Sequence, residues 1–176
     1  VAKMLVSSEA VREKAEKVFK EVGQLGVGIK GGAEILVQVM RTWLSRKGRR
    51  NQGVLKLDFE NAYNMIDRKE VGEKVQELFP ELVPWFQYCY GTAAALFCQG
   101  RRLPFDSCDG LQQGDPLAPL FFALGILKMG KRLKAELKES ASLWYLDDGS
   151  IVGPGDELLE AWRIIKEEAD QIGMRL

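Results

Sequence analysis

The stretch Trp144-Tyr145-Leu146-Asp147-Asp148-Gly149 decides the fold of this chain. Apolar runs at 142–146 and 150–152 flank it, and the pattern predicts a β-hairpin whose turn is Asp147-Asp148-Gly149. Aspartate and glycine are common in turns for structural reasons, so the stretch alone does not indicate a function. It becomes informative beside a third carboxylate, Asp58, and a corner rich in glycine and proline at 110–119.

Length and composition predict one ordinary globular domain. The chain has 176 residues and is 46% hydrophobic, enough for a sizeable core. Lys+Arg and Asp+Glu number 25 each, so the net charge of zero does not indicate a nucleic-acid partner. The basic cluster at 46–50 and the pair Arg101-Arg102 are local candidates for such contacts, and solvated loops explain them equally simply.

Several classes of site are excluded or disfavoured. The chain has no histidine, which excludes Ser-His-Asp and Cys-His nucleophiles and zinc–histidine sites within it. Its three cysteines, Cys89, Cys98 and Cys108, have no CxxC spacing and are expected to be reduced, buried residues of an intracellular protein. No apolar run reaches the roughly 20 residues that cross a bilayer, so no membrane contact is expected. The chain begins with Val1 and shows no signal peptide, which suggests a piece of a longer protein.

Hydrophobic periodicity predicts a mixture of helices and hairpins. Helices are expected over residues 8–22, 33–45, 68–78, 83–90, 117–138 and 155–172, and strands over 54–59, 93–98, 102–108, 142–146 and 150–152, with another strand beginning at 174. The expected core stripes include Leu36, Val39, Met40, Trp43 and Leu44 in the second helix, and Leu158, Trp162, Ile165, Ala169 and Ile172 in the last. This order predicts an α+β fold, an antiparallel sheet with helices on one face.

The carboxylates suggest a metal site. Asp58 ends the predicted strand 54–59. If it meets Asp147 and Asp148, each like-charge pair at about 4 Å costs roughly 4 kcal/mol at an effective dielectric near 20. A bound cation or a shared proton would relieve this repulsion. All-oxygen ligands suit Mg²⁺ or Mn²⁺, and two such ions are the usual device for phosphoryl transfer. A shared proton would serve acid–base work in a sugar or peptide cleft, and unrelated surface aspartates are the simplest alternative. Asp67, by contrast, is predicted to cap the helix that follows it.

Three ordered motifs resemble the reverse transcriptase domain of non-LTR retrotransposons. Leu57-Asp58-Phe59-Glu60-Asn61-Ala62-Tyr63-Asn64 is similar to the first palm motif of that family. The stretch 110–120 is similar to the QG-x-PL-x-P corner, and Tyr145-Leu146-Asp147-Asp148 to the Y-x-DD hairpin. A weaker likeness to the fingers extends over 23–44. The resemblance implies a single, incomplete domain over 1–176, fingers-like at 1–53 and about 68–109 and palm-like at 54–67 and 110–176, without a thumb.

The resemblance also implies roles. Asp58 and Asp147 would hold two Mg²⁺ (or Mn²⁺) ions, helped by Asp148 and the Phe59 carbonyl. Tyr63 would select deoxynucleotides, Gln113 and Gly114 would line the nucleotide pocket, and Tyr145 would lie under the primer end. The partners would be an RNA template, a DNA primer and a dNTP, together with the missing thumb and further domains of a longer polyprotein.

Alternatives stay open at this point. Parts of the triphosphate grip, the primer grip and the thumb are expected to lie outside the chain, so the isolated fragment is expected to polymerise little or not at all. A decayed or domesticated module that binds without catalysis is the second hypothesis. A viral RNA-dependent RNA polymerase is the third, which the QG-x-PL corner and Tyr63 disfavour.

Overall fold

The computed structural model describes residues 2–45 and 51–176. The basic cluster predicted at 46–50 lies outside the described residues. Within the described ranges, no helix combines the length and the apolar character needed to cross a membrane.

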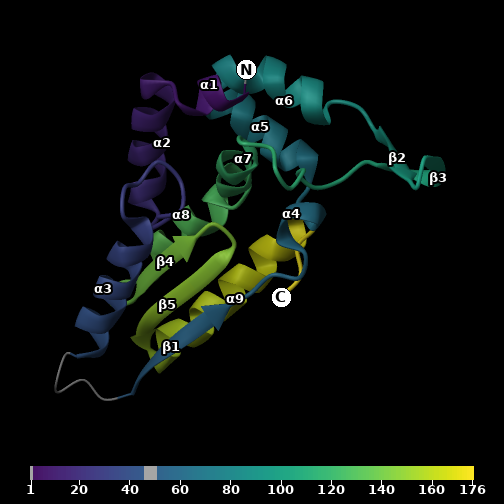
Figure 1. The fold of residues 1–176 in the computed structure, drawn as a ribbon. Coiled ribbons are helices and arrows are strands. Elements are labelled where there is room, and N and C mark those ends of the chain that lie inside the picture. The colour runs from purple at the N-terminus through teal and green to yellow at the C-terminus, as the bar shows by residue number, and fades with distance from the viewer. Residues whose placement is uncertain (1, 46–50) are drawn as a thin grey trace.

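A three-stranded antiparallel sheet forms the lower half of the molecule (Figure 1). Its order is β1 (Gln52–Leu57), β5 (Asp148–Pro154) and β4 (Ala141–Tyr145), so β5 is central. Alternation along β1 leaves Val54 and Lys56 exposed and places Leu57 in the core, as expected for a half-buried strand. The first strand of the sheet therefore pairs with a strand that comes some ninety residues later.

Helices pack around this sheet and above it. The helices are α1 (Ala2–Val6), α2 (Glu9–Glu21), α3 (Gly32–Leu44), α4 (Ala62–Met65), α5 (Arg68–Leu78), α6 (Val83–Tyr90), α7 (Ala118–Gly125), α8 (Leu127–Glu136) and α9 (Gly155–Gln171), with the 3-10 turn η1 (Pro80–Leu82). Helix α9 packs against β5 and β1, α8 packs against α9 and β4, and α3 contacts β4 and β5. The predicted α+β class is confirmed.

The core is continuous between sheet and helices. Helix α7 is buried along its whole length, which explains why its sequence is apolar on all sides. The one carboxylate that α9 buries, Glu168, is compensated by ion pairs with Lys128 and Arg132 of α8, both at 3.0 Å. These pairs fix α8 beside α9 under the sheet.

A second hairpin projects from the body (Figure 1). It consists of β2 (Ala94–Cys98) and β3 (Arg101–Ser107), joined by Gln99-Gly100 as the sequence predicts. Phe97 and Phe105 are exposed on it. Cys98 is exposed as well, as is Cys108 beyond the hairpin, so the prediction that all three cysteines are buried is wrong. All three thiols are free.

Two predicted core stripes need correction. In α3 only Trp43 of the predicted stripe is buried, and Leu44 is 55% exposed, because α3 borders the sheet along one narrow line. In α9 the buried side is rotated toward Ala161 and Ile164, which leaves Trp162 exposed.

The predicted long helix 117–138 is two helices that meet at Ile126. Gly125 precedes the break and packs closely against Ile66 and Val71, where a side chain would not fit. Glycine also has a weak helical preference, so the change of direction falls at this point. The strand predicted from 174 is not formed, although the Arg175 carbonyl accepts a hydrogen bond from the Glu60 amide (2.9 Å).

Candidate active site

The candidate site lies where β4 turns into β5. Leu57 pairs with Gly149, so continuing the same register brings Asp58 beside Asp148. On the other side of Asp148, Tyr145 is its cross-strand partner. Cross-strand partners share a face of the sheet, so these three side chains gather at one end of one face.

The turn itself differs from the prediction by one residue. It consists of Leu146 and Asp147, while Asp148 and Gly149 already belong to β5. Gly149 is needed in the strand, because a Cβ there would lie 2.7 Å from the Trp144 ring and 2.9 Å from Leu57 Cδ1. Leu146 takes a φ of +57°, the sign that a type II′ hairpin requires at its first central position.

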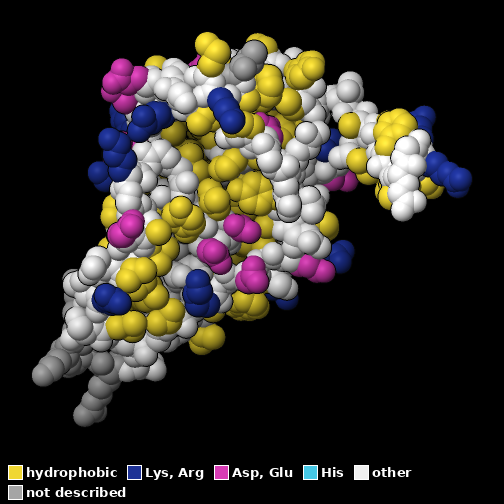
Figure 2. Space-filling model, in the orientation of Figure 1, with side chains coloured by type: hydrophobic (Ala, Val, Ile, Leu, Met, Phe, Trp, Pro, Cys, Tyr) yellow, Lys and Arg dark blue, Asp and Glu magenta, His cyan; other side chains and the backbone are white. Residues whose placement is uncertain are grey.

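The charges of the other two carboxylates affect the pKa of Asp147. Burial raises the pKa of Asp147, its own backbone N–H partly offsets this by hydrogen bonding, and the charges of Asp148 and Asp58 raise it again. Asp58 and Asp147 are 89 positions apart in sequence, so their interaction depends on the fold. Figure 2 shows acidic side chains grouped on this face near the β4–β5 turn.

The donor set suits a hard cation. Carboxylate oxygens are the ligands that Mg²⁺ and Mn²⁺ prefer. Within residues 2–45 and 51–176, no three acidic, histidine or cysteine side chains already stand in a closed ligand arrangement. The carboxylates thus suit such an ion by their chemistry, and their side chains would have to move to ligate it.

Two aromatic rings flank the carboxylates. Tyr63 of α4 stacks on Phe122 of α7, with ring centroids 4.7 Å apart and planes at 18°. Burial, then the charge of Asp147, raises the pKa of Tyr63 to about 12, so its hydroxyl stays neutral at physiological pH. Phe59 is buried and stacks on Trp144 at 6.1 Å, so only its backbone is available to a ligand.

The corner 110–120 is attached to the same neighbourhood. The Leu111 amide donates to the Tyr63 carbonyl (2.5 Å) and the Gly110 amide to the Ile66 carbonyl (3.1 Å). Beyond these anchors, Gln113 and Gly114 are exposed, and Gly114 has a φ of +99° with open space around it. The structure therefore joins this corner to Tyr63, while Gln113 and Gly114 extend into solvent.

Sequence reasoning missed Arg68 and Tyr90, which hold the corner in place. Arg68 is buried and donates to the Gly110 carbonyl (2.7 Å) and to the carbonyl and hydroxyl of Ser107 (3.0 and 2.9 Å). Its guanidinium also lies 5.4 Å from the Tyr90 ring centroid, and the Tyr90 hydroxyl donates to Asp115 (2.7 Å). Arg68 stands first in a helix that Asp67 caps, as predicted, through the Lys69 amide (2.7 Å), and that position gives no signal of a buried arginine.

Gln24 is the other residue that the sequence did not reveal. It is only 2% exposed and hydrogen-bonds both backbone groups of Leu146 in the β4–β5 turn. A glutamine in a glycine-rich loop carries no pattern by which this contact could be predicted.

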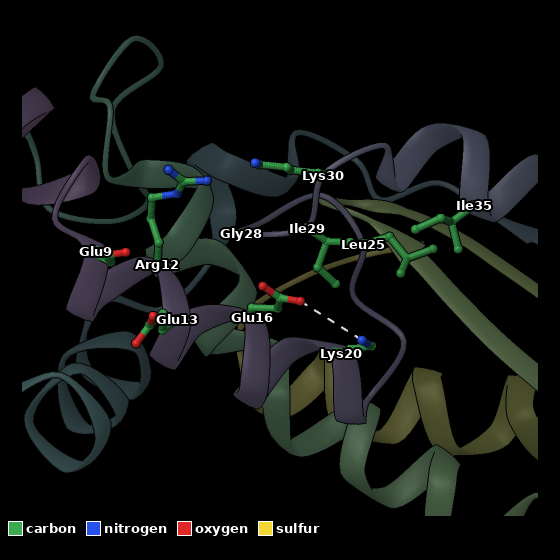
Figure 3. Close-up of a pocket in the computed structure, with 10 residues that line it drawn as sticks. All are labelled: Glu9, Arg12, Glu13, Glu16, Lys20, Leu25, Gly28, Ile29, Lys30 and Ile35. Carbon is green, nitrogen blue, oxygen red and sulfur yellow. Dashed lines mark ion pairs between the residues drawn. The ribbon is translucent and has the colours of Figure 1, made fainter.

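A pocket of about 590 Å³ lies outside the carboxylate group (Figure 3). Helix α2 contributes one wall and the loop after it the other, with Arg12 and Lys30 among the lining residues. Glu16 and Lys20, one turn apart on α2, form an ion pair along the first wall (4.0 Å). None of the predicted site residues lines this pocket, so it is separate from the candidate site.

The fold is that of a polymerase palm with part of the fingers, as two solved structures show. Telomerase from Candida tropicalis, in its apo form, superposes with a TM-score of 0.71 at 13% identity, covering 94% of this chain and 33% of that one. Telomerase from Candida albicans, in complex with a TWJ fragment of telomeric RNA, gives 0.68 at 14%, covering 94% and 32%. At these identities the likeness concerns the fold, which is a partial polymerase palm with part of the fingers.

Sequence comparison gives the family. Residues 11–176 match the model of the reverse transcriptase (RNA-dependent DNA polymerase) family, and the chain belongs to that family. The Retrotransposable element SLACS 132 kDa protein of Trypanosoma brucei gambiense is 29% identical over 174 residues. That alignment covers 96% of this chain and 14% of the relative, so the chain spans about a seventh of that protein. The predicted relation to a reverse transcriptase of retrotransposon type is confirmed.

Proposed function

We propose that the protein containing this chain is an RNA-directed DNA polymerase, which extends a DNA primer on an RNA template with deoxynucleoside triphosphates. The observation that carries the proposal is the β1–β5–β4 register, which brings Asp58 beside the Asp147-Asp148 turn. Family membership supports the reaction class. Because the proposed substrates are nucleic acids, we expect the protein to act inside the cell.

Asp58 and Asp147 are the proposed ligands of two Mg²⁺ or Mn²⁺ ions, with Asp148 and the Phe59 carbonyl assisting. Bound metal would activate the primer 3′-hydroxyl and stabilise charge on the α-phosphate and the leaving pyrophosphate. The pKa of Asp147 is raised first by burial and then by the charges of Asp148 and Asp58, and this supports the assignment, because a bound cation would stabilise the disfavoured negative charge.

The remaining predicted residues act on the substrates. Tyr63 presents a rigid ring, fixed by Phe122, where it would exclude a 2′-hydroxyl. Gln113 and Gly114, exposed on an anchored corner, would contact the incoming nucleotide, and Tyr145, 40% exposed next to Asp148, would support the primer end. We assign 1–53 and about 68–109 to the fingers and 54–67 and 110–176 to the palm.

The test is primer extension by the full-length protein on RNA and DNA templates. The wild type should extend on RNA with Mg²⁺ or Mn²⁺, and Asp147→Asn should lower the rate by at least about a hundredfold, since metal stabilisation is worth several kcal/mol. Asp170→Asn, at the exposed end of α9, is the matched control and should extend normally.

A second candidate is a decayed or domesticated module that binds nucleic acid without extending it. The chain spans 14% of the length of the retrotransposon relative, which leaves this candidate in place, and the intact carboxylates oppose it. A wild type that binds RNA, extends nothing and is unaffected by Asp147→Asn would establish this alternative.

A further inference from the structure

The side chain of Gln24 is joined to the β4–β5 turn by a pair of hydrogen bonds. Its Nε2 donates to the Leu146 carbonyl (3.0 Å), and its Oε1 accepts from the Leu146 amide (2.9 Å). The same Oε1 accepts from the Gly26 amide (3.0 Å), which fixes the amide plane of the glutamine. The backbone amide and the backbone carbonyl of Leu146 thus both bind one side chain, that of Gln24.

The surrounding backbone holds Gln24 at this position. The Leu25 amide donates to the Trp144 carbonyl (2.7 Å), and the Trp144 amide donates to the Gly23 carbonyl (2.8 Å). Gln24 and Trp144 form an isolated parallel β-bridge. The loop after α2 therefore runs as a short additional strand beside the end of β4.

The turn needs such support. Leu146 has a positive φ of 57° without being glycine, a conformation that costs of the order of 1 kcal/mol or more and persists when its surroundings fix it. Gly26 allows the loop to approach the turn this closely, because a Cβ at this position would lie 2.7 Å from the Leu146 amide nitrogen. The Leu146 carbonyl that Gln24 contacts belongs to the peptide unit that joins Leu146 to Asp147, so Gln24 fixes the backbone from which the Asp147 side chain extends.

We propose that Gln24 is a positioning residue for Asp147: it holds the strained turn so that the Asp147 carboxylate faces Asp58. This inference rests on the proposed function, because it assigns Gln24 to the metal-holding arrangement. Gln24 itself touches neither metal nor substrate. Partners that orient metal ligands commonly contribute about 10- to 100-fold to metal affinity or activity.

The test uses the full-length protein with Gln24→Met, which keeps the length of the side chain and removes its hydrogen bonds. Mn²⁺ affinity is measured by calorimetry, and primer extension gives kcat and KM for the dNTP. We expect Mn²⁺ affinity and kcat to fall about tenfold or more, while KM for the dNTP changes less than threefold. Gln76→Met, on the exposed side of α5, is the matched control and should match the wild type.

A purely structural role for Gln24 predicts a different result. It would lower the melting temperature and the active fraction, and leave the Mn²⁺ affinity and kcat of the folded fraction unchanged, which would overturn the inference. If Gln24→Met does not fold, Gln24→Asn serves instead, because its shorter amide cannot reach both groups of Leu146 without movement of the loop. Its Mn²⁺ affinity should also fall, and a wild-type value would contradict the proposal.

The outcome for the proposed function is separate. A wild type that extends primers, with Gln24→Met equal to it, refutes the positioning role alone. A wild type that neither binds Mn²⁺ nor extends a primer refutes the proposed function and, with it, the role of Gln24.

Discussion

At the scale of single residues, Tyr63 offers a direct test of substrate choice. Its ring lies against Phe122 and near Asp147, so its edge is fixed at the candidate site. Tyr63→Val should raise ribonucleotide incorporation relative to deoxynucleotide by about tenfold or more, since one steric contact is worth about 1–3 kcal/mol. Competition between the two nucleotides in primer extension measures this ratio.

The control for this variant is Tyr63→Phe. It keeps the ring and its stacking, and it removes only a hydroxyl that is neutral at assay pH, so discrimination should be retained. If Tyr63→Val discriminates as well as Tyr63→Phe, the assignment of Tyr63 to sugar selection fails.

The raised pKa of Asp147 predicts how the stability of the protein depends on pH. Because its pKa is raised in the folded state, protonation of Asp147 favours folding, and this contribution is lost as the pH rises through the folded pKa. Metal-free Asp147→Asn should therefore melt a few degrees higher than the wild type near pH 7.5. The difference should disappear at acidic pH, where the wild-type carboxyl is protonated in both states.

Thermal melting across pH, with and without Mg²⁺, checks this. Added Mg²⁺ should raise the melting temperature of the wild type more than that of Asp147→Asn. A variant less stable than the wild type at neutral pH would show that burial and the charges of Asp148 and Asp58 do not disfavour the Asp147 carboxylate.

The sequence was informative about charged residues that interrupt apolar runs. It singled out Asp58, Asp147 and Asp148 as candidates, because carboxylates at strand ends and hairpins stand out from apolar runs. It could not locate Gln24 or Arg68, because their roles depend on backbone carbonyls that come close only in the folded chain.

At the scale of elements, the loop between α8 and β4 depends on one carboxylate of α9. Glu157 accepts hydrogen bonds from the amides of Lys138, Glu139 and Ser140 and from the Ser140 hydroxyl. Burial works to raise the pKa of Glu157, and these hydrogen bonds outweigh it, so the pKa lies below its ordinary value. Glu157 thus ties the start of β4 to the first turn of α9.

Glu157→Gln should lower the free energy of unfolding by about 1–2 kcal/mol at neutral pH, a figure kept modest because water reaches the carboxylate. The pKa is lowered by folding, so the stabilisation is present above the ordinary glutamate pKa and is lost as the pH falls through the folded value. Urea denaturation at several pH values measures it.

Glu160→Gln on the same helix is the control for this variant. Its carboxylate pairs with Arg163 at the surface, where such pairs contribute little, so its unfolding curve should stay near the wild type. Equal losses from Glu157→Gln and Glu160→Gln would contradict a special role for Glu157.

Elements were predicted well in type and less well in orientation. The hairpins and most helices follow from periodicity, whereas the exposed side of α3 and the position of the β4–β5 turn follow from tertiary contacts. Leu44 is 55% exposed, and Gly149 belongs to β5 because it pairs with Leu57 as well as with Trp144. The pairing with Leu57 cannot be read from the local sequence.

At the scale of the whole molecule, charge limits what this polypeptide can bind by itself. With 25 basic and 25 acidic residues, it makes no general electrostatic attraction to phosphates. The 176-residue polypeptide alone should bind a primer–template with a Kd in the micromolar range or weaker near physiological salt, and should extend it little. Fluorescence anisotropy with a labelled RNA–DNA duplex measures this, and nanomolar binding would contradict it.

The central position of β5 has a consequence for synthesis of the protein. β1 is complete at Leu57, and its partner begins at Asp148, so a growing chain carries an unpaired strand while some ninety residues are added. The loop that contains Gln24 is made even earlier relative to its partner, since 122 positions separate Gln24 from Leu146. Contacts this distant form slowly, and unpaired strand edges invite aggregation. A product that stops before the β4–β5 turn would hold Asp58 on such an edge without Asp147 or Asp148. Sheet and site therefore arise in the same step of folding, and the nascent chain needs protection until that step.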